Sequence, residues 1–306
     1  MVRASDGPLR ALAGRVRYLL AAGQSQSAGR MVTYVNAVHP VAKVYDEFYL
    51  HSRSGGAAPL AQDEAGKSTA PTPTAARIRT DLTVPVFVIQ TDTEIPNFVN
   101  ARQPDTPRLR VWELAGSAHV EESQMTGVGA LPARQTCNYE NDPRLSVPVS
   151  EGPSTYLMRA ALRHMRGWIA GGAPLETDGP AIRRDPATGL ALGGVRTPQV
   201  DAPTRTLNGI RGPAGGPGFC RLFGRADVWN GDADAWDGGP GDPSPTPEPV
   251  LARLYRSKAD YTAKFERAMA ASIKAGFVLQ DDAAALRAEG EGMWPAAPAA
   301  TGADRR

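Results

Sequence analysis

Residues 16–38 read VRYLLAAGQSQSAGRMVTYVNAV, and this stretch decides the fold. A short apolar run ends at Gly23, and apolar residues then recur at helical spacing. The pattern predicts a strand, a sharp turn and a helix, with Ser25 in the turn. A serine there carries its hydroxyl at the end of a sheet, where Gly23 relieves crowding two positions earlier. Because the helix N-terminus and the backbone N–H of Gln26 would stabilise an oxyanion, Ser25 is a candidate nucleophile.

The same turn also has a purely structural interpretation. The usual nucleophile elbow reads G-x-S-x-G, whereas Ser27 occupies the last position here. A helix N-cap has a similar composition, since Ser25 or Ser27 would then accept a hydrogen bond from a free backbone amide. The motif alone does not separate the two interpretations, so the rest of the chain has to.

Three further apolar runs predict strands: VAKVYDEFYLHS at 41–52, VPVFVIQ at 84–90 and RLRVWEL at 108–114. VPVFVIQ is a continuous run of β-branched and aromatic residues, as in parallel strands that are buried on both faces. A short helical segment separates the last two runs, so strands alternate with helices as in βαβ units. We therefore predict an α/β fold with a mostly parallel, doubly wound sheet.

Each of the two later strands leads into residues suited to acid–base chemistry. Asp92 and Glu94 follow VPVFVIQ, and His119 follows RLRVWEL after a turn of small residues. The carboxyl ends of parallel strands share one edge of a sheet, so these residues and Ser25 are expected at the same edge. The chain order serine, acid, histidine is that of α/β-hydrolases. A Ser-His-acid triad is predicted, because a serine hydroxyl needs a base and the imidazole needs an orienting carboxylate.

Two choices within this triad depend on position. Glu94 lies four residues beyond Gln90, at the usual place of the acid, and is preferred to Asp92, which is the fallback. A solvated acidic turn is the structural alternative for both carboxylates. His119 is preferred as the base, since among the histidines it alone ends a strand with small residues before it. The others are interpreted as structural: His39, His51 and His164.

A single domain is predicted over residues 1–285. Within it, the loop-rich insertion at 120–153 is expected to overhang the site as a lid. Residues 180–249, dominated by Gly, Pro and Asp, indicate irregular coil. Helices are expected at 154–171 and 250–275, and a disordered tail at 286–306.

The composition argues against several classes of function. With 34 Lys and Arg against 32 Asp and Glu, no overall field indicates binding to nucleic acid or to an anionic membrane. Arg15 and Arg17 leave the N-terminal apolar stretch too short for a signal peptide, and no run approaches a membrane span. Cys137 and Cys220 fit neither a disulfide framework nor a zinc site, and their pairing stays open. Compartment and oligomeric state are not determined.

Five segments together carry a family resemblance: GQSQSAGRM, VPVFVIQTDTE, ELAGSAHVE, STYLMRAALRHMRGWIAGGAPL and LALGGVRTPQVDAPT. In this order they resemble the α/β-hydrolase-domain family that has a Ser-Gln-Ser elbow, over approximately residues 16–285. The resemblance implies a serine hydrolase that acts on small carboxylic esters, with neither a metal nor an organic cofactor. It does not identify the substrate.

The chain departs from the family in one respect. Several strands precede the elbow in a complete α/β-hydrolase, including the loop that supplies a second oxyanion amide, whereas only 24 residues precede Ser25. We therefore expect a partial α/β-hydrolase fold that begins at the nucleophile strand, either as a fragment or completed by a partner. Two alternatives to an esterase stay open: an amidase or peptidase with the same triad, and a catalytically silent binding or scaffold protein.

Overall fold

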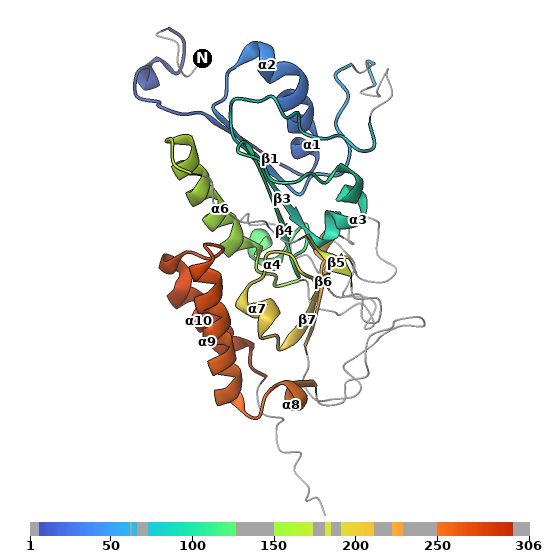
Figure 1. Cartoon of the computed structure of the whole chain (residues 1–306), viewed down its shortest axis with the longest axis vertical. Coiled ribbons are helices and arrows are strands. Elements are labelled where there is room, and N and C mark those ends of the chain that lie inside the picture. The colour runs from blue at the N-terminus through green and yellow to red at the C-terminus, as the bar shows by residue number, and fades with distance from the viewer. Residues whose placement is uncertain are drawn as a thin grey trace, which may run out of the picture. The chain divides into compact units, whose positions relative to one another are not determined.

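The computed structural model describes residues 6–61, 63–65, 73–126, 150–173, 181–184, 191–210, 222–228 and 250–295. Its contacts divide the chain into two compact units, where the sequence predicted one domain. The first unit comprises Met1–Gln90, Glu94–Trp112 and Ala161–Asp178. The second comprises Thr91–Thr93, Glu113–Ala160 and Gly179–Arg306. Figure 1 shows the elements of both units along the chain.

The central element is a four-stranded sheet in the order β1-β2-β3-β4. Its strands are β1 (Leu20–Gln24), β2 (Glu47–His51), β3 (Val86–Thr91) and β4 (Leu109–Leu114). β1 pairs with β2 and β2 with β3, both in parallel. All four strands lie within the runs predicted from the sequence or within two residues of them, which confirms the α/β class. Among the described residues β1 is an edge strand, and its residues alternate between exposed and buried.

One face of the sheet packs against the helices that follow β1. α1 (Gln26–Thr33) continues into the π-helical turn η2 (Tyr34–Val38) and then into α2 (His39–Ala42), and α1 lies beside β1 in Figure 1. Alternate strand residues point to this face, because side chains of a strand alternate between its two sides. The apolar core that results includes Ala28, Val32, Val35, Phe48, Leu50, Val86, Val88 and Val111. Short turns η3 (Asp92–Glu94), α3 (Ile95–Phe98) and η4 (Val99–Ala101) follow β3, and η1 (Arg10–Leu12) precedes β1.

Aromatic side chains cover the opposite face of the sheet. Trp112 of β4 is fully buried and packs edge-on against Phe87 of β3 and against His164, with ring centroids 5.0 and 6.1 Å away. His164 belongs to α6 (Ser154–Ile169), which confirms the helix predicted there. Each such aromatic pair adds about 0.5–1.5 kcal/mol beyond the area it buries. His164 is therefore a packing residue, as the sequence indicated.

The second unit contains short strands and two antiparallel ladders. β5 (Arg183–Arg184) pairs with β6 (Ala191–Leu192), and β7 (Arg205–Asn208) pairs with β8 (Arg225–Val228). The helices of this unit are α4 (Glu122–Thr126), α7 (Pro198–Asp201), α8 (Val250–Leu254), α9 (Lys258–Lys274) and α10 (Ala283–Met293), with the turn η8 (Gln280–Asp282) before α10. Tyr261, Phe265 and Met269 of α9 pack with Leu286 of α10 in one apolar core.

Two predictions about the second half of the chain were wrong in part. Residues 180–249 are not all irregular coil, since they contain the β7–β8 ladder and α7. The tail expected from residue 286 is helical as far as Met293, because Leu286 packs in the core with α9 and Met293 is also buried. Most of the lid expected at 120–153 lies outside the described residues, as do Cys137 and Cys220.

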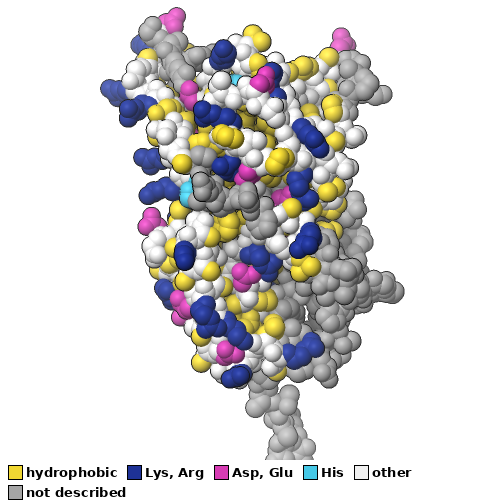
Figure 2. Space-filling model, in the orientation of Figure 1, with side chains coloured by type: hydrophobic (Ala, Val, Ile, Leu, Met, Phe, Trp, Pro, Cys, Tyr) yellow, Lys and Arg dark blue, Asp and Glu magenta, His cyan; other side chains and the backbone are white. Residues whose placement is uncertain are grey.

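No helix in the part of the chain that the structure describes is both long enough and apolar enough to span a membrane. Figure 2 shows basic side chains spread over the face in view, with acidic and apolar ones among them, rather than gathered into one patch. This distribution agrees with the balance of charges in the sequence.

Candidate active site

Ser25 occupies the turn between β1 and α1, in a backbone conformation that residues other than glycine rarely adopt. Its φ and ψ are 57° and −123°, and it is one of three described non-glycine residues with positive φ. The backbone N–H of Ser25 donates to His51 O at the end of β2, at 3.0 Å. The Ser25 side chain is half-buried and makes no capping hydrogen bond to α1. Strained backbone of this kind persists where the surroundings enforce it, and it is the geometry predicted for a nucleophile elbow.

Gly23 allows this turn to be tight. A Cβ atom at Gly23 would lie 2.8 Å from Ser27 O and 3.0 Å from Ala28 N, so the first turn of α1 passes directly over it. No alanine fits there without a shift of the backbone. The glycine two positions before the serine therefore has the role that the sequence predicted. Ser27, two positions after it, is exposed.

The two candidate acids follow β3 in the turn η3 (Asp92–Glu94). Asp92 is fully buried and Glu94 is 6% exposed, which is unlike the solvated acidic turn that was the structural alternative. Glu94 starts α3 as its N-cap residue, although its side chain makes no capping hydrogen bond. Both carboxylates are thus held inside the protein rather than in solvent.

The turn after β3 is tied to the turn after β4 within the second unit. Asp92 Oδ2 accepts from Gly116 N–H at 3.2 Å, and the Asp92 N–H donates to Ser117 O, also at 3.2 Å. Thr93 Oγ1 accepts the backbone N–H of His119 at 3.0 Å and donates to Gly209 O at 2.6 Å. His119 itself is 7% exposed. The acid-bearing turn and the histidine-bearing turn are therefore neighbours, as the parallel sheet predicted.

Glu121 also fixes the turn after β4 that contains His119, which is called the His119 turn below. Its carboxylate, which is completely buried, accepts from Ala118 N–H at 3.1 Å and from Ser154 N–H at 3.0 Å. Burial raises the pKa of Glu121 to about 7, against the lowering effect of the hydrogen bonds from Ser154 and Ala118. A Cβ atom at Gly152 would lie 2.2 Å from Glu121 Oε1, so the carboxylate fits closely under that segment.

The sequence did not assign roles to Thr93 and Glu121. Their positions could have drawn attention to them, because Thr93 lies between the two candidate acids and Glu121 lies two residues after the candidate base. The sequence does not show that these side chains connect the turns to each other and to α6 (Ser154–Ile169).

Two other histidines, which the sequence analysis interpreted as structural, are buried. The ring of His39 at the start of α2 meets Phe48 edge-on at 4.9 Å between centroids, and burial lowers the pKa of His39. His51 ends β2 with 2% exposure, and its ring lies 6.4 Å from that of Tyr49. Of the predicted triad, Ser25 and Glu94 belong to the first unit, while Asp92 and His119 belong to the second. The assembly of Ser25 with His119 is therefore a proposal, taken up below.

A parallel sheet with a strained serine between a strand and a helix, followed by acid-bearing and histidine-bearing turns, is the arrangement of the α/β-hydrolases. The chain matches the family model described as alpha/beta hydrolase domain over residues 1–288. It belongs to that family, which indicates a hydrolase. Neither the curated proteins nor the solved structures contain a match.

Proposed function

We propose that this protein is a serine hydrolase that cleaves carboxylic esters through an acyl-enzyme. Ser25 is the nucleophile, His119 is the general base, and Glu94 orients the imidazole. The observation that carries the proposal is the positive φ of Ser25 between β1 and α1, together with its freedom from helix capping. A serine that only capped a helix would use its oxygen for that purpose.

The proposed reaction has two halves. In the first, Ser25 Oγ attacks the ester carbonyl carbon while His119 takes the hydroxyl proton, and the backbone N–H of Gln26 stabilises the oxyanion. The intermediate collapses, the C–O bond to the alcohol breaks, and His119 gives its proton to the departing alkoxide. In the second half His119 activates water, which attacks the acyl-enzyme, and the carboxylic acid leaves as Ser25 recovers its proton.

The choice of acid favours Glu94. Asp92 already fixes the turn before His119 through Gly116, so its carboxylate has a structural use. Glu94 keeps the sequence position that the family uses for the acid, and it is buried in the same turn. A neutral imidazole needs one such carboxylate to set its tautomer and to stabilise the imidazolium that forms. Asp92 remains the alternative acid, and substitution of each carboxylate in turn distinguishes the two assignments.

A fluorophosphonate probe tests the nucleophile, because an activated serine attacks phosphorus as it attacks a carbonyl carbon. The probe is expected to label the protein, and Ser25→Ala or His119→Ala is expected to abolish labelling. Ser27→Ala is the matched control, since Ser27 is exposed and two residues away. Comparison of the hydrolysis rates of p-nitrophenyl acetate and p-nitroacetanilide then distinguishes an esterase from an amidase. Labelling that survives Ser25→Ala, or that never occurs on the folded protein, would leave the binding-protein alternative.

A further inference from the structure

The hydroxyl of Thr93 joins three segments of the second unit. Thr93 Oγ1 accepts from the backbone N–H of His119 at 3.0 Å and donates to the carbonyl oxygen of Gly209 at 2.6 Å. Because a carbonyl oxygen only accepts and a backbone N–H only donates, the hydroxyl proton points to Gly209 and a lone pair of the oxygen faces His119. The orientation of this hydroxyl is therefore determined by its two partners.

Gly209, which follows β7, lies against the turns after β3 and β4. A Cβ atom at Gly209 would overlap Ser117 O and would lie 2.6 Å from the Cβ atom of Asp92, so a larger residue does not fit without a shift of the backbone. The turn after β7 is closed by Asn208, whose Oδ1 accepts from Ile210 N–H at 3.0 Å. The carbonyl group that accepts from the threonine is therefore held in place by contacts of its own.

The backbone on either side of His119 is fixed as well. Ala118 N–H donates to Glu121 Oε1 at 3.1 Å. Val120 N–H donates to the carbonyl oxygen of Leu222 at 3.0 Å. The N–H of His119 lies between these two, and its acceptor is the side chain that comes from the turn after β3. Three successive backbone amides thus have three separate acceptors, which restricts rotation of the backbone that carries the imidazole.

We propose that Thr93 is a positioning residue for His119, an inference that rests on the function proposed above. Thr93 lies between the two candidate acids in the chain, and its hydroxyl ties the backbone of the proposed base to their turn. It acts through His119 and does not touch the reacting atoms. A misplacement of about 1 Å can cost ~10²-fold in rate, so an anchor of this kind affects the proton transfer from Ser25.

Thr93→Val tests the anchor, because valine has a similar shape but no hydroxyl. At matched folded fractions kcat/KM for p-nitrophenyl acetate is expected to fall by roughly 10- to 100-fold, mostly through kcat, as the imidazole loses its fixed position. Thr93→Ser keeps the hydroxyl and is expected to recover most of the activity. Hydrogen exchange of the His119 amide, followed by NMR, is expected to become faster in Thr93→Val and to stay slow in Thr93→Ser.

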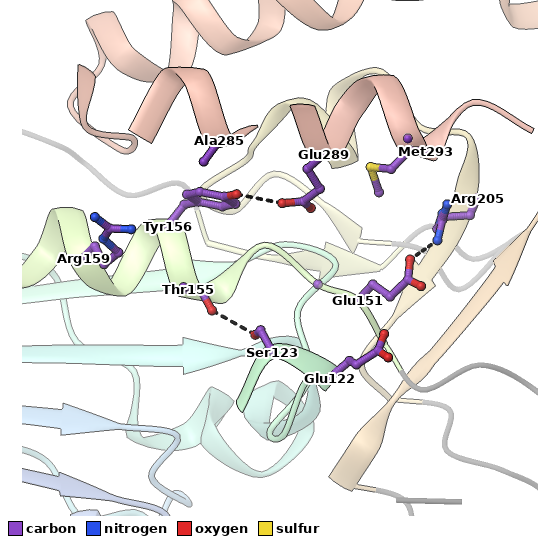
Figure 3. A pocket seen from close by; sticks show the side chains of 12 residues that line it. Glu122, Ser123, Glu151, Thr155, Tyr156, Arg159, Arg205, Ala285, Glu289 and Met293 are labelled. Atoms are coloured by element: carbon purple, nitrogen blue, oxygen red, sulfur yellow. Dashed lines mark hydrogen bonds and ion pairs between the residues drawn. The ribbon is translucent and has the colours of Figure 1, made fainter. Parts of the chain in front are cut away.

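Thr155→Val is the matched control. Thr155 belongs to the same unit, and its hydroxyl is hydrogen-bonded to Ser123 Oγ at 2.9 Å on the wall of a cavity of about 550 Å³, as Figure 3 shows. The substitution removes a threonine hydroxyl that is bonded to Ser123 instead of to His119. We expect it to leave both kcat/KM and the exchange of the His119 amide unchanged.

The results separate this inference from the proposed function. Wild-type kcat/KM in Thr93→Val, a loss that Thr93→Ser does not recover, or an equal loss in Thr155→Val would each overturn the role of Thr93. Loss of activity with unchanged exchange at His119 would also overturn it, because the effect would then not pass through that amide. A folded wild-type protein that hydrolyses no ester would contradict the proposed function, and exchange at His119 would still decide whether Thr93 fixes this residue.

Discussion

Glu121 accepts two hydrogen bonds from Ser154, one from the backbone N–H at 3.0 Å and one from the hydroxyl at 2.5 Å. Ser154 is the first residue of α6 (Ser154–Ile169), where free backbone N–H groups favour a negative charge. The same carboxylate accepts from Ala118 N–H, one residue before the proposed base His119. A single buried side chain therefore fixes the His119 turn to the beginning of a long helix.

Glu121→Gln is expected to destabilise the protein by ~1–3 kcal/mol at pH 5. At this pH the side chain of Glu121 is mostly a protonated carboxyl group, which keeps an oxygen at both positions. Glutamine places an NH2 group at one of them, and this group faces donors and leaves at least one of them unsatisfied. Urea unfolding measures the loss. Glu122→Gln is the control, because Glu122 is its exposed neighbour. If the two variants unfold alike, Glu121 does not hold the turn.

The pH dependence of Glu121 has a definite sign. Burial raises its pKa to about 7 in the folded protein, from 4.5 for an ordinary glutamate. The contribution of this group to stability is therefore complete below pH 4.5 and is lost as the pH rises through 7. The wild type should lose more stability between pH 4.5 and pH 7 than Glu121→Gln does. Parallel urea titrations across that range check this, and identical slopes would contradict it.

The elbow is the part of the site that the sequence predicted best. Its features are local: an apolar run, Gly23, a serine two residues later and a helical pattern, all within the stretch at residues 16–38. The positive φ of Ser25 and the close approach of Ser27 to Gly23 follow from that short segment alone. Local geometry can be inferred from a single sequence because it depends on few residues.

Gly23→Ala is expected to destabilise the protein by about 1–3 kcal/mol and to slow fluorophosphonate labelling of Ser25. The added methyl group would lie 2.8 Å from Ser27 O, so the turn and the start of α1 must separate. Gly29→Ala is the matched control, because no atom lies within 4 Å of a Cβ atom at Gly29. Within α1 that substitution should stabilise the protein by up to ~1 kcal/mol. Equal effects of the two variants on labelling would argue against a tight elbow.

Long-range packing explains what the sequence did not predict. Arg53 is 1% exposed, and its guanidinium donates to the carbonyl groups of Gly55 and Ala76 and stacks on the ring of Phe98. Burial lowers the pKa of Arg53 to about 10. Arginine is rarely buried so completely, and no local pattern around Arg53 indicates it. The β7–β8 ladder was missed for a similar reason, because its two short strands are separated by a long Gly- and Pro-rich segment.

Glu47→Gln is expected to stabilise the protein above pH 8. Glu47 lies in β2 with 1% exposure, and its Oε1 has no hydrogen-bond partner among the described residues. Burial raises its pKa to about 8 from 4.5, so its contribution to stability is complete below pH 4.5 and is lost as the pH rises through 8. At pH 9 the variant should be more stable by ~1–3 kcal/mol, because the buried side chain of Glu47 is then ionised and its charge costs more to bury than a neutral amide.

The pH dependence of that gain is its own check. At pH 5 the wild-type side chain is mostly protonated in the folded protein, so Glu47→Gln should change the unfolding free energy little. Glu266→Gln is the control, since Glu266 forms an exposed ion pair with Arg287 and is expected to show no such gain. A gain of equal size at pH 5 and pH 9 would show that the carboxylate charge is not the cause.

Glu94→Gln and Asp92→Asn should differ in what they damage. If Glu94 orients His119, Glu94→Gln should lower kcat/KM for an ester by roughly 10²–10⁴-fold with little change in stability, because the neutral amide cannot stabilise the imidazolium. Asp92→Asn keeps an oxygen that can accept from Gly116 N–H, so the turn should survive and kcat/KM should fall by less than about 10-fold. Glu94→Asp is expected to recover part of the lost activity, since it restores the negative charge on a shorter side chain.

The measurements are ester hydrolysis and fluorophosphonate labelling of Ser25 at matched folded fractions. The reverse ranking would move the acid to Asp92, and full activity in both variants would remove the carboxylate from the mechanism.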